Sequence, residues 1–220
     1  MENKIELEWR MYGLVPYNIS EIQKGIQYGH AVVEYGQGIK EIERKYKDGE
    51  SKFYDQTMKL VDDYNNWADN WKTFMIMNGG TSNHTQNRYQ VGEFSGTMED
   101  HLKELSDNGI HFATFYEPDL NDMLSAIVFL VDERAFKLKP YFEGDTIYPD
   151  FEDWLLIHHP EAFSNPNLEV SKFGTTSQIA KTIKTSTNPS DVELYRKWVN
   201  FIGGDKNIFL RNFIRKFRLA

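Results

Sequence analysis

The sequence predicts an α/β protein, a three-layer sandwich around a four-stranded mixed sheet, with a helical C-terminal extension. The main observation is an alternation along the chain. Short apolar runs of strand length are separated by charge-rich segments in which apolar residues recur at helical spacing. Helices that connect strands in this order cover the faces of the sheet. The strand-like runs cease beyond Tyr141, so we expect an α/β domain at residues 1–140 and a helical extension at residues 141–220.

Composition narrows the class of protein. The 220 residues are 40% hydrophobic and 15% aromatic, which is enough to build a core. The chain has no cysteine, and this excludes disulfides, thiolate zinc sites and a catalytic thiol. No apolar run approaches the roughly 20 residues of a membrane span, and the N-terminal residues lack the order of a signal peptide. We expect a cytoplasmic protein without a metal, a cofactor or a membrane partner.

The first strand and the first helix follow each other directly. The strand is expected at Ile5–Val15, where alternating residues lead into an apolar run that Pro16 ends. The helix is expected at Ser20–Tyr35, with Asn18 or Ser20 as its N-cap. Its sheet-facing side is expected to carry Ile19, Ile22, Ile26 and Val33.

Two glycines in this helix also need a reason. Gly25 and Gly29 lie about one turn apart, and glycine costs a helix about 1 kcal/mol relative to alanine. We expect both glycines to face the sheet, because close backbone approach would compensate this cost.

The spacing of apolar residues and the helix-capping residues predict the remaining elements of the α/β domain. One or two amphipathic helices, broken near Gly49, are expected between Ile39 and Trp71. Another helix begins at Thr97 and ends at Gly109. The other three strands are expected at Thr73–Met77, His111–Tyr116 and Ala126–Glu133.

The C-terminal extension combines helices with positive charge. Short helices are expected near residues 150–160 and from Ser190, which forms a capping box with Glu193, to Phe201. A basic amphipathic helix is expected at Lys206–Leu219. From Ala180 onward the net charge is +6, so the preceding residues carry −14. This asymmetry indicates an anionic partner for the basic residues, with the acidic part of the chain itself as the alternative.

Two stretches could carry chemistry. Gln27 and His30 lie one helical turn apart and are expected near the end of the sheet, where ligand sites of α/β folds gather. Glu117, Pro118 and Asp119 follow a strand, and either carboxylate could act as a base or orient a water. The alternatives remain open: Gln27 could cap a loop, His30 could be a satisfied structural histidine, and the acidic stretch could be an ordinary hairpin turn.

Together the two stretches resemble the type 2 peptidyl-tRNA hydrolase (PTH2) family. Three segments match in order: Gln27-Tyr28-Gly29-His30-Ala31, the acidic turn Glu117-Pro118-Asp119, and the strand start Ser125-Ala126-Ile127. Lys24 lies one position from the place of the family's lysine, and a serine stands for its threonine. The resemblance implies a site for tRNA acceptor ends with these candidate catalytic residues: Lys24, Gln27, His30, Glu117, Asp119 and Ser125.

We expect RNA recognition with eroded catalysis, aided by the basic residues Arg211, Arg215, Lys216 and Arg218. Binding tolerates sequence change better than proton transfer does, because proton transfer needs a group within about 3 Å of its target. The first alternative is an active hydrolase of the peptidyl-tRNA ester. The second is a protein-interaction inhibitor or adaptor without RNA. The RNA-binding protein itself could serve as a phage accessory or counter-defence protein, because anti-CRISPR proteins of phages also resemble PTH2 proteins and hold tRNA fragments. A host defence complex in the bacterial cell is then a further expected partner. A homodimer is also expected.

Overall fold

The computed structural model describes residues 7–47, 54–82, 96–120, 122–140, 142–163 and 176–220. The chain separates into two compact units. One consists of Met1–Asp132 and Asn212–Ala220, and the other of Glu133–Arg211. We call them the α/β unit and the helical unit. No helix in the described ranges is long and apolar enough to cross a membrane.

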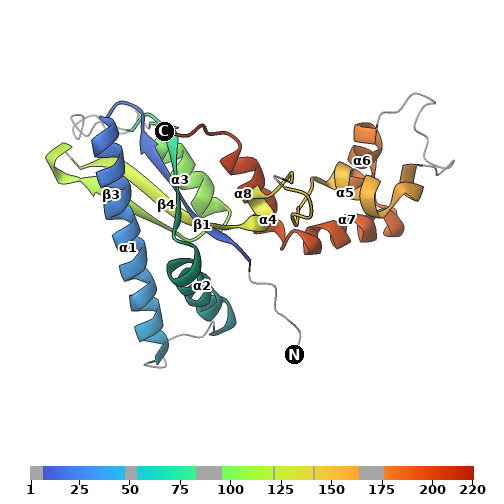
Figure 1. Cartoon of the computed structure of the whole chain (residues 1–220), viewed down its shortest axis with the longest axis horizontal. Helices are drawn as coiled ribbons and strands as arrows, with labels where there is room; N and C mark the ends of the chain where they lie inside the picture. Colours follow the sequence, from blue (N-terminus) through green and yellow to red (C-terminus); the bar gives the residue numbers. More distant parts are fainter. Residues whose placement is uncertain (1–6, 48–53, 83–95, 121, 141, 164–175) are drawn as a thin grey trace. The chain divides into compact units, whose positions relative to one another are not determined.

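The α/β unit is built on a four-stranded sheet, and the predicted mixed sheet is confirmed (Figure 1). The strands are β1 (Trp9–Pro16), β2 (Thr73–Gly80), β3 (Phe112–Glu117) and β4 (Met123–Asp132). Their order is β2-β1-β4-β3. Only the β1–β2 pair is parallel, because β4 runs antiparallel to both of its neighbours. Strands β1, β2 and β3 therefore end on the same side, where β4 begins; we call it the carboxyl end of the sheet.

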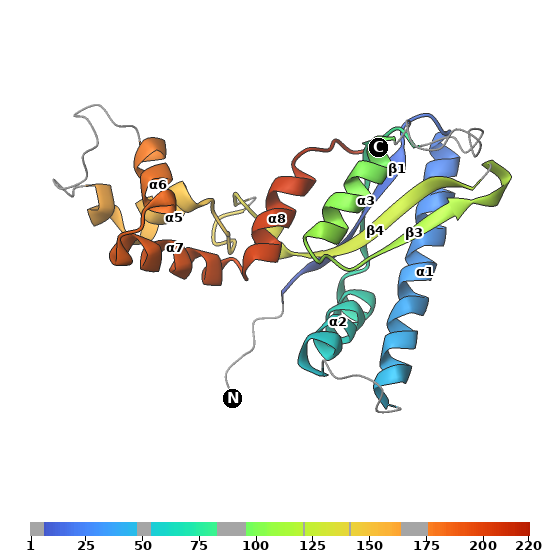
Figure 2. The same ribbon diagram turned by 180° about the vertical axis from the view of Figure 1, so that it is seen from behind.

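Helices cover both faces of this sheet. Helices α1 (Glu21–Lys47) and α2 (Tyr54–Asn66) pack on one face, and α3 (Thr97–Asp107) packs on the other (Figures 1 and 2). Side chains alternate between the faces along β1: Met11 and Val15 join the core under α1, whereas Leu14 faces Met98 of α3.

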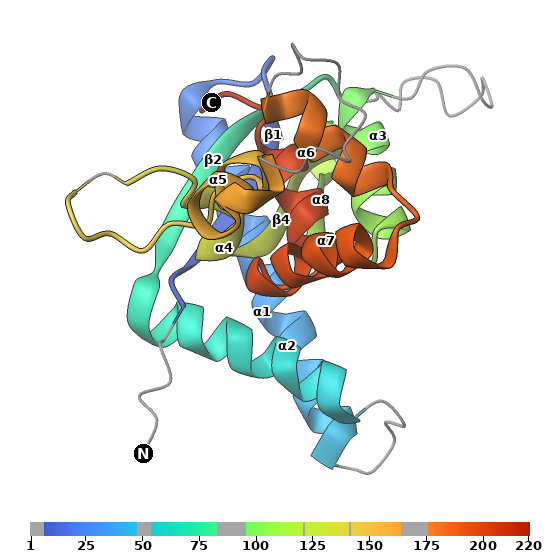
Figure 3. The same ribbon diagram turned by 90° about the vertical axis from the view of Figure 1, so that its right-hand side faces the viewer.

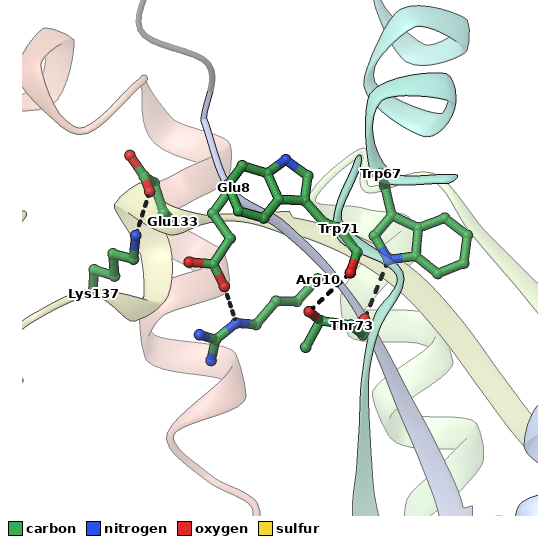
Figure 4. Close-up of polar contacts among 7 residues, drawn as sticks. All are labelled: Glu8, Arg10, Trp67, Trp71, Thr73, Glu133 and Lys137. Atoms are coloured by element: carbon green, nitrogen blue, oxygen red, sulfur yellow. Dashed lines mark hydrogen bonds and ion pairs between the residues drawn. The ribbon is translucent and has the colours of Figure 1, made fainter. Parts of the chain in front are cut away.

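A short π-helix, Trp67–Trp71, links α2 to β2. The indole Nε1–H of Trp67 donates to the Thr73 carbonyl at 3.2 Å, and the Thr73 hydroxyl donates to the Trp71 carbonyl at 3.4 Å (Figure 4). At the start of β1, Arg10 Nε lies 2.7 Å from a carboxylate oxygen of Glu8. These contacts fix the ends of the two parallel strands that lie away from the carboxyl end.

The rotation of α1 about its axis differs from the prediction. Ile22, Ile26 and Val33 are 77%, 50% and 58% exposed, so they do not form the sheet-facing side. A Cβ added at Gly25 or Gly29 would meet no described atom within 4 Å, so neither glycine approaches the sheet. The buried side of the helix consists of Lys24, Gln27, Tyr28, Ala31, Tyr35 and Ile39.

Tyr28 provides the physical reason for this rotation. Its ring lies against the backbone of Gly13 in β1, where a Cβ would be only 2.2 Å from a ring carbon. Its hydroxyl donates to the Met11 carbonyl at 2.7 Å, and burial raises the pKa of Tyr28, which keeps the phenol protonated. The fit of a large ring onto a glycine outweighs the burial of two isoleucines and a valine.

The predicted basic helix ends five residues early. Helix α8 spans Asp205–Ile214, and the chain beyond it adds to the free side of β2. Asn78 N donates to the Arg218 carbonyl at 2.9 Å, and Ala220 N donates to the Ile76 carbonyl at 3.0 Å. Leu219 forms an antiparallel bridge with Met77. Strand pairing therefore replaces the last helical turns expected from the phenylalanine spacing.

The helical unit contains α4 (Glu133–Phe136), α5 (Phe151–His158), α6 (Thr176–Thr185), α7 (Pro189–Phe201) and most of α8 (Figure 3). Phe151 packs against Trp154, Tyr195 and Trp198, with ring centroids 5.2–6.2 Å apart. The N-cap of helix α7 lies two residues earlier than predicted: it is Asn188, whose side chain accepts from Ser190 N, and Pro189 is the first helical residue. Just after α4, Lys137 Nζ lies 2.7 Å from Oε2 of Glu133, the first residue of that helix (Figure 4).

Candidate functional site

The start of α1 places the predicted polar residues at the carboxyl end of the sheet. Ser20 N donates to Gln23 Oε1 at 3.1 Å, and Gln23 N donates to Ser20 Oγ at 3.3 Å. This reciprocal pair is a capping box, and it fixes the first turn of the helix shortly after the end of β1. Gln23 is thereby engaged at the cap, and Lys24 and Gln27 face the sheet in the first two turns.

Ser125 reaches the site through an irregularity in β4. Phe115 pairs with Ala126 and Tyr116 with Leu124, so Ser125 is the extra residue of a β-bulge. Its side chain is fully buried, and its hydroxyl lies 3.0 Å from Gln27 Oε1 and 3.1 Å from the Phe115 carbonyl. A serine has one hydroxyl proton, so these two acceptors share it. The bulge thus turns Ser125 toward α1.

Glu117 completes the contact from the end of β3. Gln27 Nε2 donates to one carboxylate oxygen of Glu117, and Asp119 N donates to the other at 3.3 Å. Gln27 therefore connects two strands: its amide nitrogen faces the carboxylate of β3, and its amide oxygen faces the hydroxyl of β4. Asp119 is exposed and contributes its backbone N–H from the turn Pro118–Leu120.

Lys24 and His30 lie on either side of Gln27. Lys24 is buried, and its Nζ lies 2.9 Å from Glu21 Oε1. His30 is exposed, and its ring stacks on Phe115 with centroids 4.5 Å apart and an interplanar angle of 18°. Phe115 was not predicted as part of the site. The available signal was strand alternation, since Phe115 and Glu117 lie two positions apart on one face of β3.

The arrangement is suited to holding a ligand more than to nucleophilic attack. The two hydroxyl contacts of Ser125 are an amide oxygen and a backbone oxygen, and neither is a base that could take its proton. In contrast, Gln27 uses both its amide N–H and its amide oxygen within the cluster, and this fixes the partly exposed Glu117 carboxylate at the end of β3. Among the described residues, no three His, Asp or Glu side chains are grouped so that they could hold a metal ion.

The four predicted RNA-binding residues fall into different environments. Arg211 is only 2% exposed, and it donates to Asp150 Oδ1 at 2.8 Å and to the Arg134 carbonyl at 2.7 Å within the helical unit. It thus offers no exposed surface to a phosphate, contrary to the prediction. Lys216 is half-exposed and paired with Glu104. Arg215 and Arg218 are exposed on the segment after α8.

Comparison of the chain with protein-family models, with curated proteins and with solved structures found no match. The fold and the site define a mixed α/β protein with a bonded polar cluster at the carboxyl end of its sheet. We call this cluster, Gln27, Glu117 and Ser125, the Gln27 cluster.

Proposed function

We propose that the α/β unit binds the acceptor end of tRNA, or a similar single-stranded RNA end, at the Gln27 cluster, as a divergent PTH2-like protein without ester hydrolysis. The observation that carries the proposal is the Gln27 amide, which is 4% exposed and bonded to side chains of two different strands. Burying an amide is unfavourable unless its hydrogen bonds are made, and an apolar side chain would fill the same space at a lower cost in free energy. The buried amide holds the partly exposed carboxylate of Glu117 in place, and a fixed carboxylate is the kind of group that accepts hydrogen bonds from ribose hydroxyls and base edges.

Aromatic surfaces around the cluster support the same ligand class. The stacked rings of His30 and Phe115 lie beside Gln27, one helical turn along α1. Tyr17, just after β1, is 56% exposed. All of these residues belong to elements that meet at the carboxyl end of the sheet. Unpaired bases stack on such rings with little dependence on sequence.

The charge distribution favours a short RNA end over a long duplex. Arg218 lies beside Asn78 of β2, close to the carboxyl end of the sheet. Of the exposed cations that the structure describes after α8, Lys216 is paired with Glu104, so we expect about two phosphate contacts, from Arg215 and Arg218. The slope of log affinity against log salt concentration should then be about −1.4, at about 0.7 per single-stranded phosphate.

A binding assay with matched variants tests the proposal. A 5′-labelled oligonucleotide with a tRNA acceptor sequence is titrated with the full chain, and fluorescence anisotropy is measured. Gln27→Leu removes both amide contacts and should weaken binding by tenfold or more, about 1.4 kcal/mol. Glu117→Gln keeps the side-chain shape and should also weaken binding. The control Gln178→Leu, on α6, should bind like the unaltered chain.

Two outcomes would contradict the proposal. Equal affinity of the unaltered chain, Gln27→Leu and Glu117→Gln would remove the cluster from the binding site. Release of the peptide from peptidyl-tRNA at an ordinary enzyme rate, of order 1 per second, would favour the hydrolase instead. In that case the buried Lys24, one turn before Gln27, is the first residue to replace.

A further inference from the structure

We propose that the helical unit binds duplex DNA, with α6 and α7 as a helix-turn-helix whose second helix, α7, enters the major groove. Residues 186–188 join the two helices, and α6 packs against both α5 and α7 (Figure 3). Two helices joined by a turn of about three or four residues are the basis of this DNA-binding motif. The inference is independent of RNA binding at the Gln27 cluster.

The turn between α6 and α7 has a defined structure. Ser186 N donates to the Ile183 carbonyl at 3.2 Å, and Asn188 N donates to Ser186 Oγ at 3.0 Å. Asn188 Oδ1 then accepts from Ser190 N at 3.0 Å and caps α7. These bonds fix how one helix follows the other, as a helix that is presented to a groove requires.

The inner side of the two helices belongs to the core of the helical unit. Its buried residues are Ile179, Ala180, Ile183 and Trp198. The Trp198 indole Nε1–H donates to the Pro149 carbonyl, just before α5, at 3.2 Å. This bond and the packing of the Trp198 ring on Phe151 set the rotation of α7 about its axis. The opposite side of α7 is therefore turned away from the core.

Side chains that recognise base edges lie on that opposite side. We call it the outer side of α7; its exposed residues are Val192, Arg196, Lys197 and Asn200. Arg196 and Asn200 lie one turn apart, each about 160° around the helix from Trp198. Arginine pairs with guanine edges and asparagine with adenine edges, and apolar groups contact the thymine methyl. Arg196 also pairs with Glu193, but an exposed ion pair contributes little and is easily exchanged.

Helix α6 supplies positive charge for the DNA backbone. It contains the exposed residues Lys181 and Lys184 and no acidic residue. Lys184 Nζ lies 5.7 Å from the ring centroid of Tyr195 on α7, so this lysine lies where the two helices meet. In a helix-turn-helix the first helix crosses the sugar-phosphate backbone while the second reads the groove. The lysines thus lie on the helix that meets phosphates, and Arg196 and Asn200 on the helix that meets bases.

The composition of the outer side of α7 selects duplex DNA as the partner. A helix that docks into a groove of a protein presents apolar anchors at successive turns, whereas Val192 is the single apolar member of the outer side. The major groove of double-stranded RNA is too deep and narrow for side chains to read. The major groove of B-form DNA admits an α-helix.

Selection from random DNA tests base recognition. The probe is a pool of labelled duplexes of about 20 base pairs, or two helical turns, with a randomised sequence. Repeated selection on the full chain, followed by sequencing, should enrich one short motif. Arg196→Ala and Asn200→Ala should each lower the preference for this motif over the unselected pool by about fivefold or more, as measured by fluorescence anisotropy. Both positions are exposed, so the variants should remain folded.

The salt dependence of binding tests the backbone contacts. Lys181→Ala/Lys184→Ala should weaken binding to the motif and to the unselected pool by the same factor. The slope of log affinity against log salt concentration should become less steep by about 1.8, at about 0.9 per phosphate contact on a duplex. The matched control, Lys40→Ala/Lys103→Ala, removes the same charge from exposed positions of the α/β unit and should leave affinity and slope unchanged.

Three results would overturn the proposal. They are the absence of an enriched motif, an Arg196→Ala variant that keeps the full preference, and equal affinity for a duplex RNA of the same sequence. Gln27→Leu, which should impair RNA binding, should bind the DNA motif like the unaltered chain. Failure of the RNA proposal is therefore distinguishable from failure of this one.

Discussion

The two faces of the sheet both bury polar side chains, but they treat them differently. Under α1, Gln27 and Ser125 are buried and bonded to each other, and Gln27 also donates to Glu117. Under α3, the ring of His101 lies between the edges of Phe213 and Phe217, with centroids 5.8 and 4.7 Å away. Its buried Nδ1 has no hydrogen-bond partner among the described residues. One face holds a bonded polar group, and the other holds an isolated one.

The bonded polar groups under α1 suit a recognition site, whereas the unbonded nitrogen under α3 makes stability sensitive to pH. Buried polar groups that satisfy one another are rigid and keep a defined orientation. The imidazole of His101 is partly buried and its Nδ1 makes no hydrogen bond in the described part of the chain, so the ring resists protonation. Burial lowers the pKa of His101; the Glu104 carboxylate, whose nearest oxygen is 3.8 Å from Nδ1, opposes this effect, and Lys216 adds to it. We therefore expect ligand effects from the α1 face and pH effects from the α3 face.

The largest predicted effect is a loss of stability at the α1 face. Gly13→Val would place a Cβ 2.2 Å from the Tyr28 ring, so either the ring or β1 must move. We expect the free energy of unfolding to fall by about 3 kcal/mol. Chemical denaturation monitored by tryptophan fluorescence measures this change. Gly38→Ala, which meets no described atom, is the control; a loss below about 0.5 kcal/mol for Gly13→Val would show that Tyr28 does not set the rotation of α1.

A smaller loss is expected within the Gln27 cluster. Gln27→Leu leaves the Ser125 hydroxyl and the Glu117 carboxylate with one partner fewer, at a cost of about 2 kcal/mol. Gln37→Leu, at an exposed position of the same helix, should change the stability by less than about 0.5 kcal/mol. Urea denaturation of both variants compares them directly. Equal stabilities would mean that the cluster contributes nothing to the fold.

The third effect depends on pH and belongs to the α3 face. The folded-state pKa of His101 lies below its unfolded value, so the unfolded chain takes up a proton first as the pH falls. Stability should therefore be fully present above about pH 6.5 and decline as the pH falls below that value. His101→Phe keeps an aromatic ring between Phe213 and Phe217 and should reduce the decline.

Melting temperatures measured at several pH values between 5 and 8 test this effect, with the exposed His30→Gln as the control. His30→Gln should retain the decline of the unaltered chain. If His101→Phe shows the same decline as the unaltered chain, the decline comes from other titratable groups.

The smallest effect is a gain of stability on the side of α1 that touches neither face of the sheet. Gly25→Ala adds a methyl group where no described atom lies within 4 Å. We expect the free energy of unfolding to rise by up to about 1 kcal/mol, measured by denaturation at low micromolar concentration. A loss of stability would mean that Gly25 has a close neighbour within the chain.

Much of the fold could be predicted from the sequence because strand length and helical spacing are local properties. Residues 73–77 and 126–132, for example, lie within strands β2 and β4, as predicted. The proximity of Gln27 to Glu117 was also accessible, since both lie where elements meet at the carboxyl end of the sheet. The N-cap at Ser20 follows from its pairing with Gln23 in the same turn.

The rest depends on contacts between residues distant in sequence. The apolar spacing of Ile22, Ile26 and Val33 predicted the wrong side of α1, because a single ring, Tyr28, fits a glycine in another strand. Arg211 was read as a surface cation because nothing in its own helix reveals its bond to Asp150, which lies 61 residues away. The strand-like course of residues 218–220 is set by the unpaired side of β2, which the local sequence does not contain.

That pairing has a consequence for solubility. An edge strand of a sheet presents a row of unpaired amides and carbonyls, to which strands of other molecules can pair. Residues 218–220 pair with Ile76–Asn78 of β2 and so cover part of this edge. The segment is short, and its exposed Arg218 places a positive charge at the edge. Removing these three residues would expose the edge of β2. We expect the shortened chain to aggregate at concentrations at which the full chain stays in solution.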